Sequence, residues 1–254
     1  QPAARPRIDV EHYLIDAEVN PRTQSLTATV AVRFLPLDDR LSSAVFEFNG
    51  ALSVSKAVDS TGRELGASRG AQDNTIRLSF PEPLSRGKAE TVTFHYTGRL
   101  SGVEESPVYG IRFASIQDDL AYLMYPSRWI PINDYTADRF AATLRITVPE
   151  GMRVIAPGLE TKESKAGRTV YSFENSRPGF PASIAVVQGT PISVSAGGAA
   201  NLVFFRGESA AMARAYGEEA AKLMAEMTAS FGIPPQAALT LVETDRHTPN
   251  GYSA

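Results

Sequence analysis

The string GASRG, residues 66–70, is one pattern in this 254-residue chain that could carry chemistry, because it matches the G-x-S-x-G form of a serine nucleophile. Such a serine sits on a sharp turn between a buried strand and a helix. Here TGREL precedes the string and AQDNTIRL follows it, which indicates a turn and then a strand. Ser68 is therefore predicted to lie in a hairpin connection, and a serine-hydrolase function is disfavoured.

Metal-dependent or acid–base chemistry would require His, Asp or Glu side chains at ligand spacing. The three histidines are far apart in the sequence, at His12, His95 and His247. None has a second histidine or a carboxylate at helical ligand spacing, so the H-E-x-x-H zinc pattern is absent. His12 and His95 fall in predicted strands, where a neighbour or water can satisfy them. We expect no catalytic residue and no metal ligand in this chain.

Three pairs of acidic residues are adjacent in the sequence: Asp38–Asp39, Glu104–Glu105 and Asp118–Asp119. Adjacent side chains on a strand point to opposite faces, so these pairs are expected to solvate loops. A calcium ion bound in loops 98–108 or 114–120 is an open alternative, because calcium takes loop oxygens as ligands. The chain has no cysteine, which excludes disulfides, thiolate zinc sites and a cysteine nucleophile.

The segment YLMYPSRWIPINDY contains four aromatic side chains, Tyr122, Tyr125, Trp129 and Tyr135. Such a run more often builds core and corner packing than a ligand platform. The segment still draws attention, because two prolines and the only tryptophan lie in a long connection, where binding residues are common.

Composition limits the function further. The chain is 43% hydrophobic and 21% charged, as in ordinary globular proteins. A net charge of −3 provides no electrostatic footprint for nucleic acid. No apolar stretch reaches the roughly 18 residues that a membrane span needs. Residues 1–9, opening QPAARPR without a start methionine, are interpreted as a disordered lead-in. Artificial trimming and removal of a secretory signal would both leave such an end, and we favour a secreted or periplasmic location, with the cytoplasm as the alternative.

The elements that would position any site are mainly strands. From residue 10 to residue 206 the hydrophobic period is two, which predicts an antiparallel all-β domain, a sandwich or saddle. LTATVAVRF and HYLIDAEV alternate and are joined by the turn NPRTQS, which predicts a hairpin. Further strands are predicted at 44–48, 54–58, 75–80, 91–96, 110–113, 121–125, 141–148, 153–156, 169–173, 183–188, 192–195 and 201–205.

The period changes near Ser209. Residues 209–231 predict a helix with Ser209 as N-cap, a Glu218–Lys222 pair and Gly232 after its end. An apolar stripe is predicted on one face, formed by Tyr216, Ala220, Leu223, Met224, Met227 and Phe231. A strand follows in ALTLVE, residues 238–243. We interpret residues 207–254 as the incomplete start of a mixed α/β domain.

Four stretches in this order resemble the membrane alanyl aminopeptidase family of zinc metallopeptidases. They are HYLIDAEVNPRTQSLTATVAVRF, YGIRFASIQDDLAYLMYPSRWIPIND, FAATLRITVPEGMRVIAPG and YGEEAAKLMAEMTASFGIPPQAALTLVE. The resemblance covers nearly the whole chain. It implies a saddle-like β domain followed by the first helix and strand of a thermolysin-like catalytic domain, truncated before the zinc-binding motif.

The resemblance also implies where a peptide would be held. The family's Gly-Ala-Met-Glu-Asn motif falls at NGYSA, residues 250–254, and its Thr-Gln-x-Glu string falls at residues 125–128, although the letters differ at both places. The substrate-binding candidates are therefore Tyr125, Ser127, Arg128, Asn250, Gly251 and Tyr252.

On this hypothesis the chain is the substrate-side part of a zinc-dependent aminopeptidase-like peptidase. Its partners would be a peptide and the rest of its own catalytic domain, and zinc would bind only in the full-length parent. The chain alone is expected to be inactive. The alternatives are a non-catalytic β-sandwich binding or scaffold module and a catalytically dead peptidase homologue.

Overall fold

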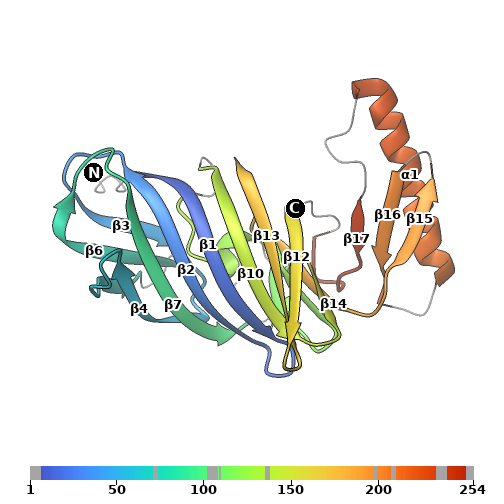
Figure 1. The fold of residues 1–254 in the computed structure, drawn as a ribbon, viewed down its shortest axis with the longest axis horizontal. Coiled ribbons are helices and arrows are strands. Elements are labelled where there is room, and N and C mark those ends of the chain that lie inside the picture. Colours follow the sequence, from blue (N-terminus) through green and yellow to red (C-terminus); the bar gives the residue numbers. More distant parts are fainter. Residues whose placement is uncertain are drawn as a thin grey trace. The chain divides into compact units, whose positions relative to one another are not determined.

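The computed structural model describes residues 7–70, 74–101, 108, 110–134, 138–196, 199–206, 210–232 and 239–249. These residues form two compact units (Figure 1). Unit 1 extends to Val186 and takes in the chain again from His247, whereas unit 2 comprises Val187–Arg246. Strands dominate the described chain, which confirms the predicted mainly-β fold. No helix among the described residues is long and apolar enough to cross a bilayer.

Unit 1 is built around a seven-stranded sheet in the order β12-β13-β10-β1-β2-β7-β4 (Figure 1). The neighbouring strands are antiparallel except β1 and β10, which are parallel. The predicted first hairpin is confirmed as β1–β2. The strand bounds are β1 Ile8–Asn20, β2 Ser25–Pro36, β4 Leu52–Asp59, β7 Glu90–Arg99, β10 Phe140–Pro149, β12 Leu159–Lys165 and β13 Arg168–Gly179.

Two smaller sheets complete unit 1. One has the order β3-β6-β5 and the other β11-β14-β9-β8. The β3-β6-β5 sheet packs on the large sheet through aromatic pairs such as Phe46–Phe94, whose ring centroids lie 5.3 Å apart. Their strands are β3 Leu41–Glu47, β5 Gly66–Arg69, β6 Thr75–Leu84, β8 Ala114–Ile116, β9 Leu120–Leu123, β11 Met152–Ile155 and β14 Ile184–Gln188.

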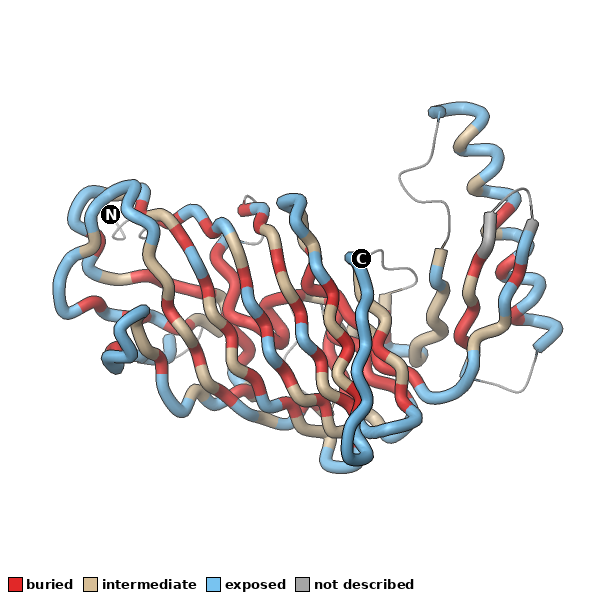
Figure 2. Tube along the Cα trace, viewed as in Figure 1, coloured by how far each residue is buried: buried red, intermediate tan, exposed pale blue. Residues whose placement is uncertain are grey.

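Alternation in sequence becomes alternation in burial along the large sheet. In β1 and β2, buried apolar residues regularly alternate with exposed or half-buried ones (Figure 2). The exposed face carries ion pairs between strands: Glu11–Arg33 at 2.8 Å joins the neighbours β1 and β2, and Glu18–Arg168 at 2.7 Å joins β1 to β13 across β10. Exposed pairs of this kind contribute little to stability, so apolar burial on the other face is the main stabilising term.

Unit 2 contains β15 Ile192–Ala196, β16 Ala199–Phe204, β17 Thr240–Val242 and the helix α1 Ala210–Phe231. β17 pairs with β16 in parallel orientation. The predicted boundary after residue 206 stays a prediction, but β15 and β16 lie with α1 in this unit, which begins at Val187.

The helix packs through a different face from the predicted one. Its buried residues are Ala213, Gly217 and Ala221. In the predicted stripe, Tyr216 is 61% exposed and Phe231 is 89% exposed. The reason is close approach: a Cβ on Gly217 would lie 2.7 Å from Cγ2 of Val194. Small side chains therefore pack against the sheet, and four of the large apolar residues of the predicted stripe, Tyr216, Leu223, Met227 and Phe231, are exposed.

The predicted helix ends are partly confirmed. Gly232 has φ 98° and its N–H donates to the Thr228 carbonyl at 2.9 Å, as expected of a glycine that ends a helix. Lys222 pairs with Glu219 at 3.8 Å in place of the predicted Glu218. Ser209, the predicted N-cap, lies outside the described residues.

Candidate substrate-contact site

The first half of the predicted site lies on a short 3-10 helix, η1 Pro126–Arg128. Pro126 suits the first helical position because its φ is already fixed. Tyr125 before it is extended, with φ −93° and ψ 113°, as a residue preceding proline prefers. The Arg128 N–H donates to the Tyr125 carbonyl at 2.8 Å, which closes the turn.

η1 is held by the connection between β3 and β4. The Asn49 N–H donates to the Ser127 carbonyl at 3.0 Å. Its side-chain amide donates to the Arg128 carbonyl at 2.9 Å. One step along, Glu47 and Ile132 exchange backbone hydrogen bonds of 2.7 and 2.9 Å. Asn49 is 3% exposed, so these bonds satisfy polar groups that burial would otherwise penalise. Asn49 was not among the predicted site residues, and its position before Gly50 was the one signal in the sequence.

The aromatic residues around η1 build the core, which confirms the packing interpretation for Tyr122 and Trp129. Both are buried, at 1% and 0% exposed. The Trp129 indole N–H donates to the Ala182 carbonyl at 2.8 Å. Its own carbonyl accepts a hydrogen bond from the Tyr96 hydroxyl at 2.7 Å. Tyr135, the fourth member of the run, lies outside the described residues.

The three site candidates on this segment differ in accessibility. Ser127 is fully buried and Arg128 is 7% exposed, whereas Tyr125 is half-buried. The Ser127 hydroxyl has no hydrogen-bond partner among the described residues. Tyr125 is thus the most accessible of the three, and its ring lies 5.6 Å from that of Phe113.

The second half of the predicted site, Asn250, Gly251 and Tyr252, lies outside the described residues. The residues just before it are described and approach the first half. The Arg112 N–H donates to the His247 carbonyl at 2.6 Å, and Thr248 is buried. On the other side, the Met124 N–H donates to the Phe113 carbonyl at 2.7 Å. Residues 112–113 therefore link the segment leading to residue 250 with the segment entering η1, both within unit 1.

The histidines of the large sheet have ordinary partners, as predicted. His12 Nε2 lies 3.2 Å from Thr143 Oγ1, and His95 Nδ1 lies 3.1 Å from Thr29 Oγ1. Burial lowers the pKa of both imidazoles, so both favour the neutral form.

One buried carboxyl group ties the start of β1 to the loop before β10. Asp138 Oδ2 accepts hydrogen bonds from the Val10 N–H at 3.2 Å and the Asn133 side-chain amide at 2.8 Å. The same amide group donates to the Ile8 carbonyl at 3.0 Å. Burial raises the pKa of Asp138 against the lowering effect of these bonds. The cluster joins three backbone segments, and its role is structural.

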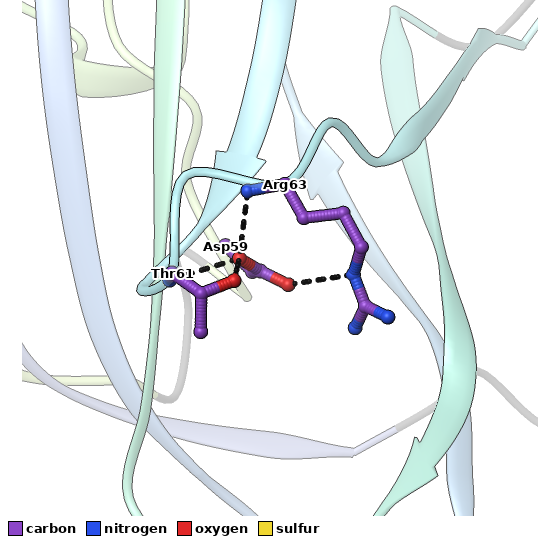
Figure 3. Close-up of polar contacts among 3 residues, drawn as sticks. All are labelled: Asp59, Thr61 and Arg63. Atoms are coloured by element: carbon purple, nitrogen blue, oxygen red, sulfur yellow. Dashed lines mark hydrogen bonds and ion pairs between the residues drawn. The ribbon is translucent and has the colours of Figure 1, made fainter.

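Two acidic residues bind partners at different distances along the chain: Asp38 binds a remote arginine, whereas Asp59 stabilises a turn. The Asp38 carboxylate accepts from the Arg7 N–H and Nε at 2.8 and 2.9 Å. Asp59 accepts four hydrogen bonds from Thr61 and Arg63 at 2.6 to 3.1 Å (Figure 3). The bond from the Thr61 hydroxyl is the main reason that the pKa of Asp59 is lowered to about 2. A cavity of about 360 Å³ lies beside this turn, with both charged and apolar lining.

Ser68 lies in β5, so the predicted hairpin connection is itself an edge strand of the β3-β6-β5 sheet. The next element in the described chain is the strand β6 and not a helix, which agrees with the rejection of a nucleophile elbow. Among the described residues, no group of three His, Asp or Glu side chains is placed to hold a metal ion.

No known protein-family model matches the sequence, and no curated protein matches it. Solved structures do match the fold. A mutant M1 zinc metallopeptidase from Deinococcus radiodurans, bound to a Tyr-Ser-Ala substrate, has a TM-score of 0.70 at 23% identity. The match covers 92% of this chain and 56% of that one.

A two-domain M1 zinc metallopeptidase mutant bound to L-arginine has the same TM-score and identity, over 94% of this chain and 57% of that one. The Deinococcus radiodurans M1 enzyme itself gives a TM-score of 0.69 at 22% identity. The fold is that of the N-terminal, β-rich part of an M1 zinc metallopeptidase. The chain spans a little more than half the length of these solved structures.

Proposed function

We propose that this chain is the substrate-side part of a zinc-dependent, aminopeptidase-like peptidase, and that the part of unit 1 around η1 contacts the amino-terminal end of a peptide. The fold match supports the class of protein. One geometric observation supports the site: residues 112–113 bind the segment before η1 on one side and His247 on the other. Two stretches some 120 residues apart in sequence thereby approach one another where the resemblance places substrate contacts.

In this proposal Tyr125 is the accessible contact, because Ser127 and Arg128 are buried. The two buried residues would shape the wall behind it. A tyrosine ring offers apolar area together with a hydroxyl that can donate or accept, which suits the first side chain of a peptide.

Zinc would be held elsewhere in the parent. The described residues do not provide a set of His, Asp or Glu ligands, so no catalytic step is assigned to them. The contribution of this chain would be binding and orientation. The isolated chain is accordingly expected not to hydrolyse amino-acid arylamides, and zinc-dependent cleavage by the purified chain would contradict that expectation.

The test of the proposed site is a titration of the isotope-labelled chain with the tripeptide Tyr-Ser-Ala, followed by amide NMR. We expect saturable shifts at Tyr125, Phe113 and His247, and much weaker shifts with the N-acetylated tripeptide, which has no charged amino terminus. Equal responses to the two peptides, or shifts confined to other surfaces, would overturn the site.

The class of protein is tested separately by the source gene beyond the codon for Ala254. An H-E-x-x-H motif with a downstream glutamate would support a zinc peptidase. A continuation without those ligands would favour a catalytically dead homologue or a scaffold module.

A further inference from the structure

Arg69 makes an unusual set of contacts for a residue on an exposed edge strand. The other three residues of β5 are also exposed, and only β6 pairs with this strand among the described residues. The Arg69 guanidinium nevertheless reaches back into the protein. Nη1 donates to the Phe48 carbonyl at 2.7 Å, and Nη2 donates to the carbonyls of Asn49, at 3.0 Å, and Leu52. The guanidinium carbon lies 4.6 Å from the centroid of the Phe48 ring.

The three acceptors belong to one tight segment, residues 48–52, which we name the 48–52 turn. This turn connects β3 to β4 and contains Asn49, whose N–H and side-chain amide hold the carbonyls of Ser127 and Arg128. Asn49 Oδ1 accepts from the Ala51 N–H at 3.0 Å, which folds the turn back on itself. A displacement of the turn would therefore move the two donors that fix η1.

Only a guanidinium can serve this arrangement fully. Its planar fork presents five N–H donors in fixed directions, and it can also stack on an aromatic ring. A lysine ammonium is a compact charge on a flexible stem, so it can reach some of the three carbonyls but cannot reproduce the fork and the stacking together. The three carbonyls belong to the buried residues Phe48, Asn49 and Leu52, whereas Arg69 itself is exposed, so after its loss only water entering from the surface can take its place as donor. The expected consequence is a loosened turn within an otherwise intact fold.

We propose that Arg69 is a positioning residue for η1: through the 48–52 turn and Asn49 it sets the place of Tyr125–Arg128. Its functional meaning rests on the proposed function, in which Tyr125 contacts a peptide. Arg69 itself touches no substrate. It determines how firmly the peptide-contacting segment is held before binding. A segment that is already ordered binds more tightly, because less conformational entropy is lost when the peptide binds.

The first test measures hydrogen exchange of two amides at the junction: that of Asn49, which bonds to the Ser127 carbonyl, and that of Glu47, which bonds to the Ile132 carbonyl. In Arg69→Met we expect at least tenfold faster exchange at Asn49 and a smaller acceleration at Glu47. Exchange in β1 should stay within twofold of wild type, because the opening is local. In Arg69→Lys the exchange rate at Asn49 should lie between those of wild type and Arg69→Met.

The matched control is Arg77→Met. Arg77 lies on β6, opposite Ser68 of β5, and donates to the Ser43 hydroxyl at 3.0 Å on the exposed side. This variant removes an arginine from the same small sheet without touching the 48–52 turn, and the exchange at Asn49 should not change. Unchanged exchange at Asn49 in Arg69→Met, or equal acceleration throughout β1, would overturn the positioning role.

The second test links position to binding. In Arg69→Met the Tyr-Ser-Ala titration should show an affinity at least fivefold weaker than wild type, with Arg69→Lys partly restoring it and Arg77→Met matching wild type. Wild-type affinity in Arg69→Met despite faster exchange at Asn49 would overturn the role in binding. If the wild-type chain does not bind the tripeptide, the proposed function fails, whereas the exchange comparison still decides whether Arg69 positions η1.

Discussion

The two units of this chain differ most in how much core each one has. In unit 1 a single cluster of buried side chains runs through all three sheets, and large residues such as Trp129, Tyr13 and Phe94 are almost wholly buried. In unit 2 the corresponding cluster in the described chain consists of Val194, Val203 and Ala213, with three partly buried neighbours. Apolar burial is the main favourable term in folding, so unit 2 should be the less stable part.

In the described chain, unit 1 also has more buried polar side chains that are bonded to the backbone than unit 2. Unit 1 has several buried polar groups tied to backbone, among them Asn49 and Asn133. In unit 2 one fully buried side chain, Asn201, links the elements: its amide donates to the Gly217 carbonyl at 3.1 Å and its oxygen accepts from the Leu239 N–H at 3.1 Å. The candidate site therefore lies on the well-packed unit, whereas few buried residues hold α1.

The largest effect is expected from Phe94→Ala in unit 1. Phe94 is fully buried and meets Phe46 edge-on, so truncation should lower the free energy of unfolding by about 3–5 kcal/mol. Urea unfolding can separate the units, because Trp129 is the only tryptophan and α1 the only α-helix of the described chain. The Trp129 transition should move to lower urea and the helical circular-dichroism transition should not. Equal shifts of both would mean that the two units unfold together.

Two glycine substitutions, one in each unit, test how tightly each unit is packed. In Gly98→Ala the new Cβ would lie 2.3 Å from the Ala51 carbonyl oxygen, a backbone atom that cannot turn aside. In Gly217→Ala it would lie 2.7 Å from Cγ2 of Val194, a β-branched side chain with little rotamer freedom. Each overpacking should cost about 1–3 kcal/mol, which in Gly217→Ala exceeds the gain of up to about 1 kcal/mol from alanine's helix propensity.

The two variants should act on different signals. Gly98→Ala should shift the transition of Trp129, and Gly217→Ala that of the helix. Gly62→Ala is unsuitable as a control because Gly62 has φ 84°, where any side chain is strained. Gly66→Ala is suitable, since its Cβ would meet only Ser79 at 3.6 Å and ordinary contact is expected. A stabilised helix in Gly217→Ala would show that the α1 contact is loose.

Period-two alternation was sufficient to predict most strands of unit 1, because one face of each strand is buried against a core. β5 and β12 were missed for the opposite reason: in both strands every residue is exposed, so no alternation marks them. The predicted strand at 110–113 was wrong. The strand in that region is β8, Ala114–Ile116, whose three residues are all buried and so show no period either.

The helix shows a second limit of sequence patterns. A stripe of large apolar residues usually marks the buried face, but α1 buries Ala213, Gly217 and Ala221, because a tight approach to β15 and β16 selects small residues. The residues that hold the candidate site were not predicted either. Neither Asn49 nor Arg69 lies near residue 125 in sequence, and their contacts with η1 and the 48–52 turn arise only from the fold.

A smaller, pH-dependent effect is expected at Asp138 in unit 1. Burial raises its pKa in the folded state above the unfolded value, so its favourable contribution is complete below the unfolded pKa and is lost as pH rises through the folded pKa. Asp138→Asn keeps an oxygen that can accept from Val10 and Asn133 but cannot ionise. The variant should therefore gain stability relative to wild type as pH rises from the acid range to neutrality, as measured by the Trp129 transition.

Asp59→Asn is the control with opposite sign. Hydrogen bonds from Thr61 and Arg63 lower the pKa of Asp59 to about 2, so its contribution is present above the unfolded pKa of 3.8 and is lost as pH falls through about 2. This variant should be less stable than wild type near neutrality, with the gap closing in acid. Parallel trends in the two variants would contradict the assignment of burial as the cause at Asp138.

The smallest effect is expected at Phe231, the last residue of α1. Its side chain is 89% exposed, so Phe231→Ser should change the free energy of unfolding by less than about 0.5 kcal/mol, as surface substitutions usually do. Gly217→Ala, at a buried position of the same helix, provides the reference. A loss above about 1 kcal/mol in Phe231→Ser, read from the helical signal, would mean that the apolar stripe inferred from the sequence is buried in solution after all. Residues other than Ala213, Gly217 and Ala221 would then also hold α1, and unit 2 would be more stable than its described core indicates.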